Sequence, residues 1–289
     1  MSMTEGGAYF ESFNDLFSRS MDRADPRVSS LFLMGSVNGI IIVVVAYMLM
    51  VHYGLKYMKG RKPFDAKQLV FIYDCFMVAI NAYIVYECVA VAFSENFSII
   101  CQKVDYSSNS NAVRLVRAIW LFHISKVIEC LDTFFFIIRG RTHLVTWLHI
   151  YHHCTMMPLT WAGVKWVAGG ELFQPVAVNS MIHVIMYSYY ALAALGPKWR
   201  KFLWWKRYLT MLQMIQFTYG MLYSCISLYN QCGLRRSVYG LNLFYEGSLL
   251  LFFYNHYQQS YHKSKGQRTL LTTEENLTVN QTGENAKMD

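Results

Sequence analysis

The sequence predicts an all-α protein that crosses a membrane seven times. Hydrophobic residues make up 54% of the 289 residues and charged residues only 15%, compared with roughly 25% charged residues in soluble domains. The charges lie between long apolar runs, each near the roughly 20 residues that a helix needs to cross the hydrocarbon core. Because the membrane interior offers no water to the backbone, such runs are expected to be helical.

The apolar runs follow one another along the whole chain. We expect the seven spans at residues 31–52, 68–93, 113–138, 144–167, 173–195, 202–228 and 238–257. The first run lacks a small-residue cleavage site, so we expect it to remain in the protein. The predicted organisation is a lumenal segment at 1–30, a seven-helix catalytic domain at 31–258 and a disordered tail at 259–289.

The positive charges predict the orientation of the chain. Lysine and arginine concentrate at 56–67, 139–141, 198–207 and 263–268, which fall on one side of a seven-span protein. The positive-inside rule makes that side cytosolic. We therefore expect a lumenal N-terminus and a cytosolic C-terminus, and the net charge of +8 needs no nucleic-acid partner.

Two of the seven cysteines lie in predicted lumenal loops rather than in spans. Cys101 and Cys232 would meet an oxidising compartment, which permits disulfide formation. We expect these two residues to be bridged.

Ionisable residues inside the spans are the strongest functional signal in the chain, because burying them in a membrane is costly. Lys126, Glu129 and Asp132 are spaced by three in the third span and share one helix face. They can neutralise one another, so an ion-pair staple between helices is one interpretation and a functional site is the other.

Histidines cluster in the next two spans. His149, His152 and His153 fall within about 100° of one helix circumference, so all three can face one cavity. His183 adds a fourth imidazole from the fifth span. Other polar candidates follow at helical spacing in the fifth and sixth spans, and these can serve the site or act as hydrogen-bonding links between helices: Asn179, Tyr187, Gln213 and Gln216.

Two chemistries fit a dense histidine site: metal binding, and metal-free nucleophilic or general-base catalysis. Membrane desaturases and hydroxylases also use a His-x-x-His-His box, but they repeat it to surround two irons. This chain has nine histidines and a single box. We therefore expect no metal, and a metal-dependent membrane lipid oxidoreductase remains the alternative.

At these residues the sequence resembles the very-long-chain fatty-acid elongases of animals and fungi. The resemblance extends from Asp25 to the end of the seventh span. The matching motifs are Lys126-x-x-Glu129-x-x-Asp132-Thr133-x-Phe135-Phe136, His149-x-x-His152-His153, Asn179-x-x-x-His183-x-x-Met186-Tyr187-x-Tyr189-Tyr190 and Thr210-x-x-Gln213-x-x-Gln216-Phe217. Three further segments look most like the animal branch that favours saturated and monounsaturated chains: 61–64, 104–107 and 195–197.

The resemblance implies a multi-pass enzyme of the endoplasmic reticulum. Six of its seven helices would surround a narrow acyl tunnel, with the first helix outside. The implied reaction condenses a long-chain acyl-CoA with malonyl-CoA to a 3-ketoacyl-CoA, as the first step of fatty-acid elongation. The implied partners are both CoA substrates, membrane lipid, the ketoreductase, dehydratase and enoyl reductase of the cycle, and further elongase copies, with no cofactor beyond the substrates.

For this reaction we expect His152 to form an acyl-imidazole, assisted by His149 and His153. His183 and Asn179 would donate hydrogen bonds to the developing oxyanion. Lys126 and Arg139 would hold the CoA phosphates. The remaining predicted substrate-binding residues are Glu129, Asp132, Tyr187, Gln213 and Gln216.

Two other interpretations stay open. Cys154 follows the histidine box, where a small hydroxyl residue is more usual in the family, and a thiolate nucleophile there is one alternative. A seven-helix receptor or a transporter is the other, although a receptor has no reason to collect these histidines and the sequence lacks the internal repeats of many transporters.

Overall fold

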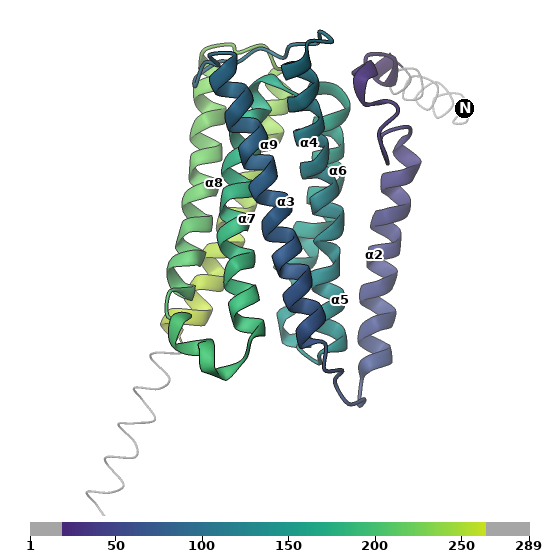
Figure 1. Cartoon of the computed structure of the whole chain (residues 1–289), viewed down its shortest axis with the longest axis vertical. Coiled ribbons are helices and arrows are strands. Elements are labelled where there is room, and N and C mark those ends of the chain that lie inside the picture. Colours follow the sequence, from purple (N-terminus) through teal and green to yellow (C-terminus); the bar gives the residue numbers. More distant parts are fainter. Residues whose placement is uncertain (1–18, 264–289) are drawn as a thin grey trace, which may run out of the picture.

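The computed structural model describes residues 19–263. Most of the predicted N-terminal segment and of the predicted tail therefore lies outside the described residues. The described part is helical and holds no strand. Its long helices run side by side along the long axis of the molecule (Figure 1). They are α2 (Val37–Met58), α3 (Lys67–Ser94), α4 (Ser110–Ile128), α5 (Cys130–Ile138), α6 (Trp147–Val167), α7 (Phe173–Ala194), α8 (Lys206–Tyr229) and α9 (Arg236–Tyr257).

Each of the seven predicted spans overlaps a helix or a pair of helices, although α2 ends at Met58 instead of residue 52 and α8 begins at Lys206 instead of residue 202. The third span is shared by α4 and α5, which are separated only at Glu129, whose backbone stays in the right-handed helical region. The fourth, α6, contains Pro158. Proline removes one backbone hydrogen bond and is accepted inside membrane helices where neighbouring groups compensate.

The first helix begins later than the sequence predicts. Residues 31–36 form turns instead, and Leu33 has a φ of 64°, which ends any helical path there. Side chains of α6 donate to carbonyls of this turn that have no helical partner. The Trp161 Nε1 donates to the Leu33 carbonyl at 3.0 Å, and the buried Lys165 Nζ donates to the Met34 carbonyl at 2.8 Å. Hydropathy alone marks these residues as apolar but carries no signal for these contacts.

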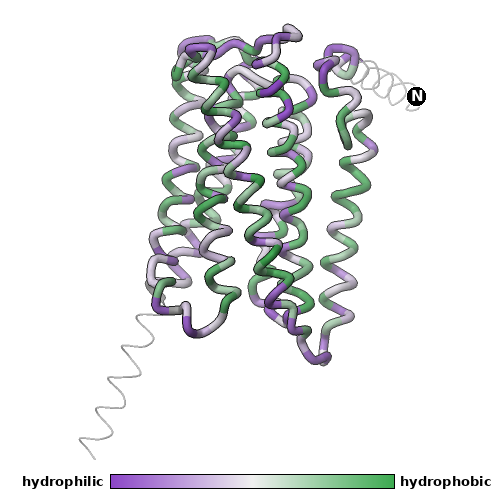
Figure 2. The backbone as a smooth tube through the Cα atoms, viewed as in Figure 1, coloured by the Kyte–Doolittle hydropathy of each residue, from purple (hydrophilic) through white to green (hydrophobic). Residues whose placement is uncertain are grey.

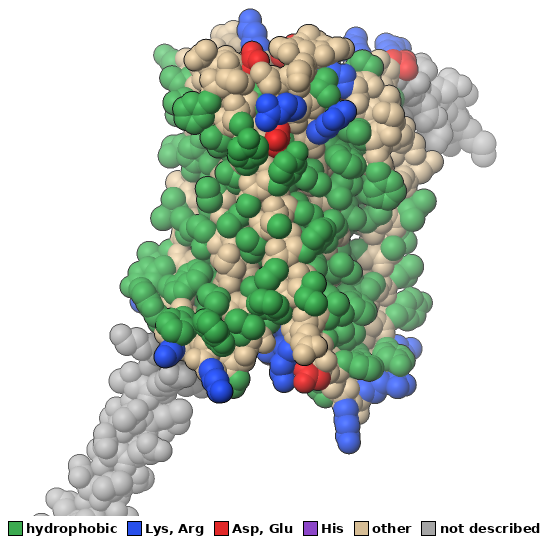
Figure 3. Space-filling model, in the orientation of Figure 1, with side chains coloured by type: hydrophobic (Ala, Val, Ile, Leu, Met, Phe, Trp, Pro, Cys, Tyr) green, Lys and Arg blue, Asp and Glu red, His purple; other side chains and the backbone are tan. Residues whose placement is uncertain are grey.

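The surface of the bundle matches a membrane environment. By length and apolarity, three stretches of the described residues are able to cross a membrane, namely Val37–Met58, Lys67–Ser94 and Gly170–Ala194. Hydrophobic positions run along the middle of the helices (Figure 2), and a broad hydrophobic band separates two ends where charged side chains gather (Figure 3). Large apolar side chains are exposed at the surface of these helices, including Phe93 at 80% and Leu251 at 71%.

The helices pack into one body. Helix α3 packs against α7 and α4, α4 against α6, and α8 against α7 and α9. Helix α2 lies at the edge and contacts α5 and α6 (Figure 1). The main buried apolar cluster joins α2, α3, α4, α6 and α7 through residues such as Tyr47, Ile84, Ile119 and Met157.

A disulfide joins the α3–α4 loop to the α8–α9 loop. It links Cys101 to Cys232, the pair expected from the sequence, with a Cα–Cα distance of 5.1 Å across a sequence separation of 131. The bridge ties the two loops together at the end of the bundle where α3 ends and α9 begins.

Replacing both bridged cysteines, Cys101→Ser with Cys232→Ser, is expected to destabilise the fold by about 5 kcal/mol, because so long a loop gains much chain entropy in the unfolded state. Thermal unfolding of the purified protein without reductant measures the effect. Cys225→Ser is the matched control, because Cys225 is an exposed unpaired thiol on α8. An unchanged unfolding temperature in the double variant would contradict the prediction.

Candidate active site

A cavity of about 650 Å³ lies inside the bundle. Its walls come from α3, α5, α6, α7, α8 and α9, and from Glu129 at the α4–α5 break; no α2 residue contributes. Its lining also includes Arg139, Arg141 and His143 from the segment between α5 and α6, together with Lys206 at the start of α8. The cavity therefore reaches the end of the bundle that carries the predicted cytosolic loops.

Nearly all the residues selected from the sequence line this one cavity. Four helices and the segments beside them bring together the predicted catalytic residues and all but one of the predicted substrate-binding residues. These are His149, His152, His153, Asn179, His183, Glu129, Asp132, Arg139, Tyr187, Gln213 and Gln216. Residues from four separate sequence motifs therefore line the same cavity.

Glu129 contacts two nitrogen-bearing side chains at the inner wall. Its Oε1 lies 2.8 Å from the Lys126 Nζ and 3.0 Å from the His183 Nδ1. A carboxylate oxygen only accepts hydrogen bonds, so a hydrogen bond in this contact requires a protonated Nδ1. The Lys126 Nζ lies 3.3 Å from the same Nδ1 and 3.4 Å from Nε2, so both ring nitrogens have the ammonium as a neighbour. When Nδ1 donates to Glu129, donation from Nε2 to a substrate oxygen as well requires the imidazolium form.

Lys126 differs from its expected role at the CoA phosphates. Its side chain is 1% exposed and does not line the cavity. The ammonium is retained by the Glu129 carboxylate and lies 4.7 Å from the centre of the Phe122 ring. A shared helix face predicts that Lys126 and Glu129 meet, but not which of them reaches the cavity.

The Asp132 carboxylate anchors α7 to α5. Its Oδ2 accepts a hydrogen bond of 2.7 Å from the Tyr187 hydroxyl. The ring of Tyr187 packs edge-on against Tyr73 of α3, with ring centres 6.0 Å apart. These contacts assign Asp132 and Tyr187 a part in shaping the cavity wall.

Sequence reasoning missed Asp74 on α3. This carboxyl lines the cavity, the residue is 2% exposed, and its Oδ2 has no hydrogen-bond partner in the described part of the chain. The signal was present, since an ionisable residue inside an apolar span marks a functional position.

The histidine box occupies the first turns of α6. The Thr146 Oγ1 caps the helix by accepting from the His149 backbone N–H at 3.2 Å. The rings of His149 and His153 are 4.5 Å apart and those of His152 and His153 are 5.2 Å apart. The His149 Nε2 lies 2.7 Å from the hydroxyl of Thr133 on α5. The three imidazoles therefore form one contiguous group whose outer member is hydrogen-bonded to the neighbouring helix.

Cys154 lies apart from this group. Its Sγ donates to the Sδ of Met48 on α2 at 3.2 Å, and the residue does not line the cavity. Within residues 19–263, no group of three or more His, Cys, Asp and Glu side chains is arranged to hold a metal ion. The expectation of a metal-free site stays a prediction.

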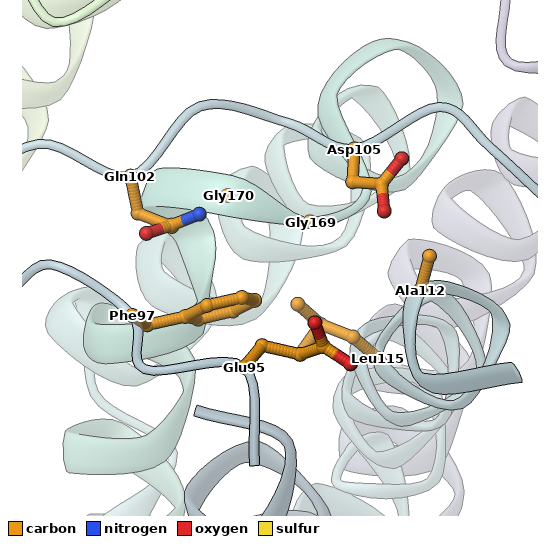
Figure 4. A pocket seen from close by; sticks show the side chains of 8 residues that line it. All are labelled: Glu95, Phe97, Gln102, Asp105, Ala112, Leu115, Gly169 and Gly170. Carbon is orange, nitrogen blue, oxygen red and sulfur yellow. The ribbon is translucent and has the colours of Figure 1, made fainter. Parts of the chain in front are cut away.

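A second, smaller cavity of about 150 Å³ lies at the other end of the bundle. The segments 95–105, 112–115 and 169–170 converge on it (Figure 4). Gly170 has a φ of +48°, and a Cβ there would lie 2.6 Å from the Gln102 carbonyl oxygen, so the close approach of these loops requires glycine. None of the predicted site residues lines this cavity.

The fold and the large cavity define a helical membrane protein with a buried histidine site. Comparison with known proteins specifies the family. The family model described as ELO, the GNS1/SUR4 family, matches residues 32–269. Very long chain fatty acid elongase 4 of Macaca mulatta is 42% identical over 257 residues, covering 89% of this chain and 82% of the relative.

Two further relatives are also fatty acid elongases. Very long chain fatty acid elongase 7 of Rattus norvegicus is 37% identical over 273 residues, covering 91% of this chain and 96% of the relative. Very long chain fatty acid elongase 5 of Tachysurus fulvidraco is 34% identical over 256 residues, covering 89% and 86%. The chain therefore belongs to the GNS1/SUR4 family, together with these fatty acid elongases.

Proposed function

We propose that this protein is a very-long-chain 3-oxoacyl-CoA synthase. It condenses a long-chain acyl-CoA with malonyl-CoA and a proton, and it releases a 3-ketoacyl-CoA, CO₂ and CoA. The observation that carries the proposal is the convergence of His149, His152, His153 and His183 on one cavity whose rim is basic, in a chain of the elongase family.

The first stage transfers the acyl group to the enzyme. The His152 imidazole attacks the thioester carbonyl, a C–N bond forms, and the C–S bond breaks. The CoA thiolate leaves with the proton released by the imidazole, so the enzyme retains a neutral acyl-imidazole. Covalent catalysis of this kind divides one difficult step into two easier ones.

The second stage forms the new carbon–carbon bond. Malonyl-CoA loses CO₂, and the electrons of the broken bond form an enolate. The enolate attacks the acyl carbon, the C–N bond breaks, and His152 regains a proton. His183 and Asn179 stabilise the oxyanion of this step by hydrogen bonding, and His149 and His153 orient or deprotonate the nucleophile. Enclosure within the bundle excludes water that would hydrolyse the acyl-imidazole.

The position of the cavity supports a division of the substrate between two regions. Arg139, Arg141 and Lys206 line its end near the loops, where they bind the CoA phosphates. Phe217 and Phe253 line it on α8 and α9 and offer apolar surface to the acyl chain. In this arrangement α3 to α9 surround an acyl tunnel, and α2 packs outside as the first of seven membrane spans.

The cellular setting follows from the family and the charges. We place the protein in the endoplasmic reticulum membrane, with a lumenal N-terminus, a cytosolic C-terminus and the CoA-binding end facing the cytosol. Its product would pass to the ketoreductase, dehydratase and enoyl reductase of the cycle, and further elongase copies are its expected oligomer partners. Saturated and monounsaturated acyl-CoAs are the expected substrates.

Incubation of purified protein with a saturated long-chain acyl-CoA and radiolabelled malonyl-CoA, with and without a strong chelator, tests this function. We expect the label in a 3-ketoacyl-CoA in both samples. Product lost on chelation would favour the metal-dependent alternative. No product with any acyl chain length would overturn the proposed function and return the receptor and transporter interpretations.

A further inference from the structure

A line of three hydrogen-bonding side chains runs from α2 into the histidine box. The Tyr47 hydroxyl on α2 lies 3.1 Å from the Thr133 Oγ1 on α5, and the same oxygen lies 2.7 Å from the His149 Nε2 on α6. Tyr47 is 3% exposed and Thr133 is fully buried. The line is the polar link between α2, the helix outside the cavity, and a residue of the cavity lining.

The chemistry of these groups determines which way the hydrogens point. A threonine hydroxyl has one hydrogen, and a neutral imidazole nitrogen either donates or accepts. If Tyr47 donates to Thr133 and Thr133 donates to Nε2 of His149, both hydroxyl hydrogens have an acceptor and Nε2 has a donor. In the reverse direction the Tyr47 hydrogen is left without an acceptor in the described residues, and leaving a buried donor unsatisfied is costly.

From this geometry we propose that Tyr47 is a positioning residue that sets the tautomer of His149. Acting through Thr133, it makes Nε2 of His149 a hydrogen-bond acceptor and places the imidazole hydrogen on Nδ1. The inference rests on the proposed condensation and deepens it, because it decides between the two roles considered for His149. With Nε2 occupied by Thr133, His149 serves the box as a hydrogen-bond donor rather than as the base.

The contacts around His149 fit this role. Its ring meets the His153 ring at 63° with centroids 4.5 Å apart, and the Tyr47 ring lies 5.8 Å from the same His153 ring. A rotation of His149 would therefore disturb His153 as well. Tyr47 fixes the orientation of two box histidines from outside the cavity, without being part of its lining.

Steady-state kinetics of Tyr47→Phe, which removes only the hydroxyl, provide the first test. We expect kcat to fall about tenfold, the equivalent of one hydrogen bond, with the KM for both CoA substrates unchanged. Thr133→Val should lower kcat at least as much, whereas Thr133→Ser, which retains the hydroxyl, should have a kcat near that of the wild type. Combining Tyr47→Phe with Thr133→Val should cost no more than Thr133→Val alone, because both changes break the same line.

The matched control is Tyr53→Phe, a change at a 60% exposed tyrosine on the same helix, and it should leave kcat unaltered. A wild-type kcat in Tyr47→Phe would overturn the proposal. So would an equal loss in Thr133→Ser, since that variant retains the hydroxyl, or an effect confined to KM.

A spectroscopic measurement tests the tautomer without using activity. In protein labelled with ¹⁵N-histidine, the His149 resonances are those lost in His149→Gln. We expect Nδ1 to be protonated and Nε2 unprotonated in the wild type, with a shift toward the other tautomer in Tyr47→Phe. The opposite tautomer in the wild type would refute the proposal, and the result stands whether or not the protein condenses acyl-CoA.

Discussion

Replacing His152 with alanine is expected to lower the rate of condensation by at least about 10⁴-fold, the scale of losing a covalent nucleophile. The side chain lines the cavity, and its ring nitrogen forms the bond to the acyl carbon in the proposed acyl-imidazole. The Cys154 thiol does not line the cavity and contacts Met48 of α2 instead. Product formation from labelled malonyl-CoA measures the loss.

Cys154→Ser is the matched control for this change, because Cys154 directly follows the histidine box but does not line the cavity. We expect it to retain activity near that of the wild type. Thermal unfolding of the His152→Ala protein near the wild-type temperature would show that the loss is chemical. Full activity in His152→Ala refutes the histidine scheme, and inactivity of Cys154→Ser with intact folding would point to a thiolate nucleophile instead.

The sequence predicted the helices well because a membrane span leaves a long hydropathy signal. The ends of α3, α7 and α9 lie within two residues of expectation. The start of α2 was wrong by six residues, at Val37 instead of Leu31, because the turn before it depends on donors such as Trp161 and Lys165. Such contacts between distant segments leave no local pattern.

The candidate site was predictable in its members and less so in its geometry. Helical spacing identifies side chains that share a face, and it placed His149, His152 and His153 together correctly. It does not say which residues of that face reach the cavity. Lys126 was therefore expected at the substrate, whereas in the structure Glu129 lines the cavity and Lys126 does not. The line from Tyr47 through Thr133 required three helices to be placed in space.

Replacing Glu129, the carboxylate that pairs with Lys126, is the second change for which we expect a large effect. Glu129→Gln is expected to destabilise the protein by about 3–5 kcal/mol, because it leaves the buried Lys126 ammonium without its carboxylate. Both side chains are at most 2% exposed in the pair. The unfolding temperature of the purified protein in detergent measures the change.

A second substitution separates charge from packing. Adding Lys126→Met to Glu129→Gln removes the unpaired charge, and we expect it to restore more than half of the lost stability, while the amide oxygen of residue 129 still accepts from His183. Asp65→Asn is the matched control, since Asp65 pairs with Lys67 at 3.2 Å with side chains 72% and 62% exposed, and solvent weakens such pairs. It should leave the unfolding temperature unchanged. If Glu129→Gln is as stable as the wild type, or if the double variant is less stable than Glu129→Gln alone, the pair is not the buried electrostatic staple that its geometry indicates.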